Sequence, residues 1–136
     1  MNSAQDQNQA VAALKRGDRA ACLTALSHLA EAPEAAAITF APLARLADAI
    51  GASGHARRFA LRALEQDAGQ DAALLGLLDV LVRNGGMIEA RERAQSALAQ
   101  TPKSLGLHHF CGVIASQRGD NDTAQEHFSF VLSHAP

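Results

Sequence analysis

Six histidines are the residues of this sequence best suited to metal or acid–base chemistry, but their spacing does not gather them into a site. His108 and His109 are adjacent, so on a helix they point about 100° apart and cannot comfortably bind one ion. His127 and His134 share a face of the last helix but are two turns apart. No Cys, Asp or Glu cluster completes a tetrahedral ligand set. We therefore expect no metal ion and no other cofactor, and interpret these histidines as surface or inter-helix residues.

Nucleophilic chemistry is also poorly supported. Cys22 and Cys111 are far apart, which indicates neither a disulfide framework nor a zinc site, and the repeat described below assigns both to core positions. No glycine-rich loop follows a strand, no nucleophile elbow is present, and Ser, His and acidic residues form no evident triad. We predict that the chain itself is not an enzyme.

The basic residues include a group of arginines that recurs one period apart. Its members are Arg57, Arg58 and Arg62, followed by Arg91 and Arg93. Glutamates nearby in the sequence favour a solvated helix face over a phosphate-binding patch. These glutamates are Glu65, Glu89 and Glu92.

Composition indicates a helical globular protein. Apolar residues make up 48% and charged residues 19% of the 136, and Ala is the commonest residue. Five Phe and no Trp or Tyr argue against a sheet sandwich. The net charge of −2 gives no reason to expect nucleic acid or an anionic membrane. The polar start is no signal peptide, and apolar runs such as 72–78 are too short to span a bilayer. We expect a cytoplasmic protein.

A 34-residue period organises the whole chain. Four glycines recur at this spacing: Gly17, Gly51, Gly85 and Gly119. Each follows an apolar-periodic segment, where glycine supplies the left-handed conformation that ends a helix. Asp18, Ser53 and Asp122 are placed to cap the helix that follows. Five residues after each glycine a small residue begins an i, i+4, i+7 stripe. These small residues are Cys22, Ala56, Ala90 and Ala124. Each period therefore predicts two antiparallel helices joined by a short turn.

These features resemble the tetratricopeptide repeat family, whose 34-residue helix–turn–helix units close with a proline. Pro102 and Pro136 occupy the closing position, Ala68 replaces it in the second unit, and Pro33 lies one residue early. The resemblance implies an all-α fold, a right-handed superhelical stack of antiparallel helix hairpins. It places the units at approximately 3–36, 37–70, 71–104 and 105–136 of a single domain.

The chain departs from the family at two kinds of position. The family often has a bulky aromatic early in the first helix, where successive units here have Asp6, Phe40, Leu74 and His108. Asp6 lies in the polar run 5–9, which argues for fraying of that helix. Pro42 lacks an amide donor, so the second unit's first helix should begin near Thr39 or kink there.

In the family the first helix of each unit lines the concave groove. The positions that the resemblance places there are Arg45, Asp48, Leu75, Asp79, Arg83, His109, Phe110, Ser116 and Gln117. The spacing of Arg45 with Asp48 and of Asp79 with Arg83 allows intrahelical ion pairs. The alternative is a mixed-charge groove that accepts a peptide or helix of a partner protein.

The family's grip on acidic chain termini needs Lys, Asn and Arg on successive first helices. Mapped onto the first three units, those positions hold Gln7, Val11, Pro42, Ala72 and Gly76. Mapped onto the last three, they hold Ala41, Arg45, Gly76, Gly106 and Phe110. Neither set makes a carboxylate clamp.

Two functions remain open at this point. The first is a protein–protein interaction scaffold, with a protein or peptide partner. The second is an amino-terminal substrate-presenting or regulatory module of a larger transferase-type enzyme, such as a sulfotransferase or glycosyltransferase. Phe128 and Val131 should pack inside the last unit, whereas Phe130 and Leu132 are less well accounted for there. We therefore expect either that this is the amino-terminal part of a longer chain or that a second copy covers this face in a homodimer.

Overall fold

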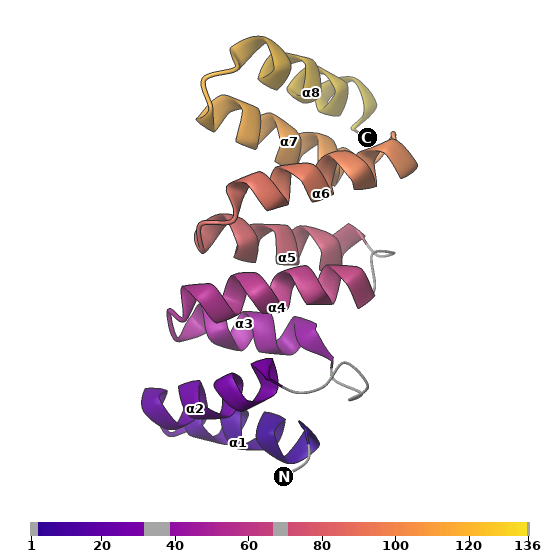
Figure 1. Ribbon diagram of the computed structural model, residues 1–136. Coiled ribbons are helices and arrows are strands. Elements are labelled where there is room, and N and C mark those ends of the chain that lie inside the picture. The colour runs from indigo at the N-terminus through magenta and orange to yellow at the C-terminus, as the bar shows by residue number, and fades with distance from the viewer. Residues whose placement is uncertain (1–2, 32–38, 67–70, 136) are drawn as a thin grey trace.

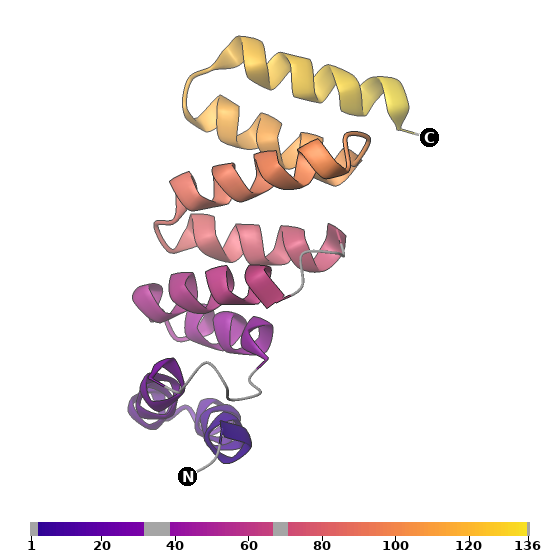
Figure 2. The same ribbon diagram turned by 45° about the vertical axis from the view of Figure 1, so that its right-hand side comes forward.

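The computed structural model describes residues 3–31, 39–66 and 71–135, and its regular structure within these ranges is entirely helical (Figure 1). The helices are α1 (Ser3–Lys15), α2 (Arg19–Ala30), α3 (Phe40–Ala49), α4 (Ser53–Gln66), α5 (Asp71–Arg83), α6 (Met87–Gln100), α7 (Leu105–Gln117) and α8 (Asn121–His134). Successive helices form antiparallel pairs that stack in one direction, with the two termini at opposite ends (Figures 1 and 2). This confirms the predicted all-α stack of helix hairpins.

The four repeated glycines make the turn inside each pair. Their φ angles are 74°, 74°, 82° and 79°, and no other described residue has a positive φ. In each turn the glycine N–H donates to the carbonyl three residues back, and the next N–H donates to the carbonyl five residues before it. The second bonds are Asp18 to Ala13 (2.8 Å), Ala52 to Ala47 (2.9 Å), Gly86 to Leu81 (2.7 Å) and Asp120 to Ala115 (2.9 Å). The sequence period is thus one repeated helix-ending motif.

The helix starts only partly follow the predicted caps. The Asp18 carboxylate accepts from the Ala21 N–H at 3.0 Å, as predicted. The prediction for Asp122 was wrong, because Asp120 caps α8 and accepts from the Thr123 N–H, while Asp122 lies in the first turn. Ser53 is the first residue of α4 rather than its cap.

Pro42 lies in the first turn of α3, two residues after its first residue, Phe40. Thr39 precedes that helix with an extended backbone, so the predicted start near Thr39 is confirmed. A proline is tolerated there because the first amides of a helix have no intrahelical partner. The predicted closing residues of three units lie outside the described residues: Pro33, Ala68 and Pro136.

The core runs continuously between the stacked pairs. The small residues of the stripe let second helices approach their neighbours: Cys22, Ala56 and Ala90 are fully buried. Around them pack other buried side chains: Leu26, Phe59, Leu74, Leu77, Leu78, Leu81 and Leu107. Each pair contacts the next, so apolar surface left by one unit is hidden by its neighbour.

Asp6 breaks this apolar pattern. At its equivalent positions Phe40 and Leu74 are each 4% exposed, and the Asp6 side chain is buried to a similar degree, 7% exposed. One of its carboxylate oxygens, Oδ1, is buried without a hydrogen-bond partner. The polar run 5–9 is nevertheless helical, since α1 begins at Ser3.

Polar contacts join adjacent pairs. The Arg19 Nε–H donates to the Ile50 carbonyl at 2.8 Å, and Ser27 Oγ lies 3.2 Å from His55 Nε2. Further along, Arg93 lies 3.4 Å from Glu65. No helix within the described ranges is long and apolar enough to cross a membrane.

Two apolar residues near the end of α8, Phe130 and Leu132, have different surroundings. Phe130 stacks between His108 and His134, with ring centroids 3.8 Å and 4.0 Å away, so it packs within its own helix pair. Leu132 instead remains 82% exposed. The homodimer expected through this face stays a prediction.

Candidate functional site

A groove lies between the first helices of the third and fourth pairs, α5 and α7. It encloses about 350 Å³ and is lined by Leu75, Asp79, Val82, Gly106, His109, Phe110, Val113, Ile114 and Gln117. Five of the residues predicted for the groove are among them: Leu75, Asp79, His109, Phe110 and Gln117. The other four, Arg45, Asp48, Arg83 and Ser116, do not line it. The structure therefore brings together five of the nine predicted residues and leaves both predicted arginines outside the groove.

The sequence interpretation missed the residues that give the groove its floor. Val82, Val113 and Ile114 lie one turn from predicted residues on the same helices, and the helical period was the signal that could have found them. Gly106 was missed for a different reason, because its role depends on packing. A Cβ atom at position 106 would stand 2.6 Å from Leu75 Cδ1, so the missing side chain is what allows Leu75 to lie against α7.

The charges near the groove are paired differently from the prediction. Arg83 bonds to Asp48 of the preceding pair, with Arg83 Nη2 2.7 Å from Asp48 Oδ2. The Asn84 amide donates to the same carboxylate at 2.9 Å. The interpretation as intrahelical Asp79–Arg83 and Arg45–Asp48 pairs was therefore wrong: helix spacing allowed those pairs, but the stacking of α3 on α5 offers Arg83 a bidentate partner.

This inter-pair bridge has a clear electrostatic signature. The hydrogen bond from Arg83 holds the pKa of Asp48 below its ordinary value, against the desolvation that raises it, and Asn84 adds to the lowering. The same hydrogen bond raises the pKa of Arg83. Arg83 thus links the second and third helix pairs through its ion pair with Asp48. Asp79, which is exposed, forms no ion pair with any residue that the structure describes.

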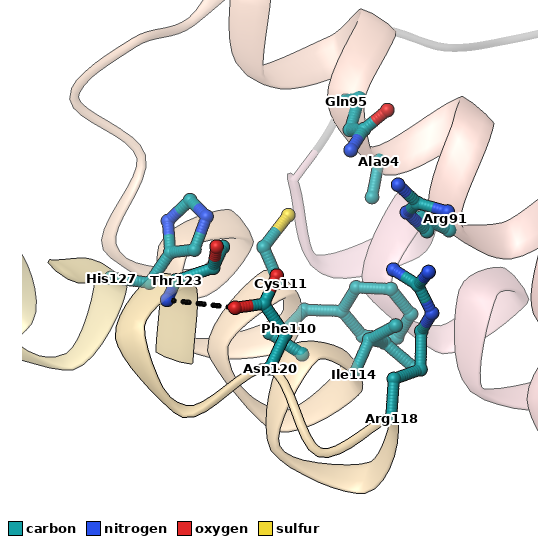
Figure 3. Close-up of a pocket in the computed structure, with 11 residues that line it drawn as sticks. Arg91, Ala94, Gln95, Phe110, Cys111, Ile114, Arg118, Asp120, Thr123 and His127 are labelled. Carbon is teal, nitrogen blue, oxygen red and sulfur yellow. Dashed lines mark hydrogen bonds between the residues drawn. The ribbon is translucent and has the colours of Figure 1, made fainter. Parts of the chain in front are cut away.

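A second hollow opens between α6, α7 and the start of α8 (Figure 3). It encloses about 190 Å³, and Figure 3 shows Arg91 and Arg118 at one side and His127 and Thr123 at the other. Cys111 points into it, so this cysteine is half-buried rather than a full core residue as predicted. Desolvation raises the pKa of its thiol.

The arginines predicted to share one face have separate roles. Arg62 lies over the Phe40 ring, 4.2 Å from its centroid, and Arg93 pairs with Glu65. The Arg57 side chain lies against the turn between α5 and α6, where a Cβ atom at Gly86 would be 3.2 Å from Arg57 Cγ. Arg62 and Arg93 are thus each engaged with a side chain of another helix.

The histidines of the last pair interact with one another. His108 Nε2 donates to the Pro102 carbonyl at 2.7 Å, and His108 Nδ1 lies 3.0 Å from His127 Nδ1. Desolvation, followed by the charge of His108, lowers the pKa of His127. Within the described part of the chain no three His, Cys, Asp or Glu residues are grouped so that they could hold a metal ion.

The architecture defines a class of protein, the helical-repeat proteins built from stacked hairpins. No protein-family model and no curated protein matches the sequence. Solved structures do match. A tetratricopeptide repeat protein from Parabacteroides merdae superposes with a TM-score of 0.68 at 14% identity, over 98% of this chain and 53% of that one.

Two structures of MamA are similar as well. MamA MSR-1 gives a TM-score of 0.69 at 18% identity, covering 98% of this chain and 76% of its own. MamA AMB-1 gives 0.65 at 20% identity, covering 92% and 68%. The chain thus has the tetratricopeptide repeat fold that its sequence resembles, and it spans about half the length of the Parabacteroides protein. At these identities the likeness concerns the fold alone.

Proposed function

We propose that this chain is a protein-interaction scaffold, and that the groove between α5 and α7 holds a segment of a partner protein. The observation that carries the proposal is an exposed, unpaired acid set in an apolar groove: Asp79 beside Leu75, Val82 and Val113. The groove lies on first helices, which stack side by side and present their side chains along one face.

The occupant that fits this groove is a peptide segment with a branched apolar side chain next to a lysine or arginine. The apolar side chain would fill the space between Leu75 and Val113, where burial contributes about 25 cal/mol for each Å² removed from water. The neighbouring base would pair with Asp79, which forms no ion pair of its own because Arg83 is bound to Asp48, although the charges of Asp79 and Arg83 still attract each other.

The experiment selects binders from a displayed library of 12-residue peptides and measures their affinity by calorimetry. We expect enrichment of apolar–basic pairs and roughly tenfold weaker binding to Asp79→Arg, equivalent to ~1.4 kcal/mol. Glu92→Arg makes the same charge change on the exposed face of α6 and is the matched control, which should bind as wild type. Selected peptides that bind Asp79→Arg as tightly as wild type would refute the proposal.

A further inference from the structure

The hollow between α6, α7 and α8 has an apolar floor and a basic rim. Its floor consists of Ala94, Phe110, Ile114 and Ala115, which are all buried. Its volume of about 190 Å³ is comparable with the ~150 Å³ apolar cavity that holds one benzene ring in another protein. A single aromatic ring or branched aliphatic group therefore fits it.

The rim carries two arginines that form no ion pair among the described residues. Figure 3 shows the guanidinium groups of Arg91 and Arg118 at the same side of the pocket as the Phe110 ring. Other arginines of this chain do find carboxylates, as Arg83 and Arg93 do. Arg91 and Arg118 come from different helix pairs, so the stacking of the pairs is what brings them to one pocket.

Asp120 is the one acid that lines this hollow, and it is already engaged. Its carboxylate accepts from the Thr123 N–H at the start of α8. Hydrogen bonding by the Thr123 side chain, and then by its backbone, lowers the pKa of Asp120, with smaller contributions from the charges of Arg118 and Arg91. The dashed line in Figure 3 marks this bond, on the side of the pocket away from the two guanidinium groups. The pocket thus retains a net positive rim.

Two guanidinium groups at one side of a pocket attract an oxyanion, which gains charge-assisted hydrogen bonds and offsets the repulsion between the two positive charges. Arginine suits this role because its planar fork donates two parallel bonds to a carboxylate. The floor adds a second requirement, since an inorganic anion would leave the apolar surface around Phe110 uncovered.

We propose that this pocket binds an apolar carboxylate, with the carboxylate held by Arg91 and Arg118 and the apolar body resting on Phe110 and Ile114. The pocket shares Phe110 and Ile114 with the groove between α5 and α7, but its arginines do not line that groove, so the proposal does not depend on the function proposed for the groove. Two sources share this chemistry, a free organic acid and the terminal residue of a peptide chain.

The first test is calorimetry with two acids and their neutral analogues. 3-Phenylpropionate stands for a free acid, N-acetylphenylalanine for a chain terminus, and the corresponding primary amides lack the charge. We expect an acid that binds to have an affinity at least ~10-fold higher than that of its amide. The acid with the higher affinity shows whether the natural ligand is a free organic acid or the terminal residue of a peptide chain. Equal affinity of acid and amide, or no binding of either acid at millimolar concentration, would overturn the proposal.

The second test locates the binding. Arg91→Gln and Arg118→Gln should each weaken the acid by roughly 5- to 10-fold, whereas Arg58→Gln on α4 should not, and thermal denaturation checks that all three fold. Bound acid should also slow alkylation of Cys111, which lines the pocket, while fully buried Cys22 stays unreactive throughout. Unchanged Cys111 alkylation at saturating acid, or equal weakening by Arg58→Gln, would place binding elsewhere and overturn the assignment.

Discussion

Replacing Asp6 with leucine should stabilise the protein, although it removes a charged residue from a helix. Asp6 is 7% exposed, and its Oδ1 atom is buried without a hydrogen-bond partner. The same position one period later is Phe40, and two periods later Leu74, both of them in the apolar core. Leucine at position 6 would therefore restore the pattern of the stack.

The expected gain in stability follows from four contributions, two favourable and two unfavourable. Removing a buried, unsatisfied polar group returns ~1–3 kcal/mol, and burying an apolar side chain adds up to ~1.5–3 kcal/mol. Against this stand the loss of an acidic residue from the first turn of α1, ~0.3–1 kcal/mol, and imperfect fit of the longer side chain, ~1–3 kcal/mol. We expect a net stabilisation of ~1–2 kcal/mol, which raises Tm by roughly 4–8 °C for a chain of this size.

Thermal and urea denaturation measure this change, and hydrogen exchange of α1 and α2 locates it. Because a stack of repeats is stabilised by neighbouring contacts, the added protection should appear mainly in the first pair. Asn8→Leu, an exposed position on the same helix, is the control and should change stability by no more than ~0.5 kcal/mol. A Tm of Asp6→Leu at or below that of Asn8→Leu would refute the reasoning.

Three further predictions concern the turns, the inter-pair bridge and the groove's selectivity. Gly51→Ala should cost ~1 kcal/mol because its φ is +74°, whereas Gly54→Ala, in the helix that follows and with open space around it, should be neutral or stabilising by thermal denaturation. Asp48→Asn should destabilise the chain at pH 7. The pKa of Asp48 is lowered on folding. The difference in the free energy of unfolding between wild type and Asp48→Asn should therefore be complete above the unfolded-state pKa of Asp48 and vanish as the pH falls through its folded-state pKa. Urea titrations at several pH values measure this difference, and a difference that does not change with pH would contradict the role of Arg83. An acidic chaperone-tail peptide should bind no tighter than micromolar, and sub-micromolar affinity by calorimetry would contradict the absence of a clamp.

The repeat was predictable from sequence because its cause is local. A left-handed residue is needed wherever a helix ends in this motif, and glycine meets that need at least cost, so Gly17, Gly51, Gly85 and Gly119 appear at fixed spacing. Pro42 was predictable for a similar reason, because a missing amide restricts where a helix can begin.

The details of the sites depended on how the pairs stack. Helix spacing alone offered Arg83 a partner in Asp79, but the neighbouring pair presents Asp48 in a better geometry. The contact of Leu75 with Gly106 and the meeting of Arg91 with Arg118 likewise join separate units, and no local pattern encodes them. The cap of α8 was missed by two residues, since Asp120 and Asp122 both fit a cap in sequence.

Phe110 and Ile114 line both the groove of α5 and α7 and the pocket of α6, α7 and α8. These two side chains thus separate two ligand spaces, and a rotation of the Phe110 ring that widens one compartment narrows its neighbour. An occupant of either space would then affect binding in the other through these shared side chains.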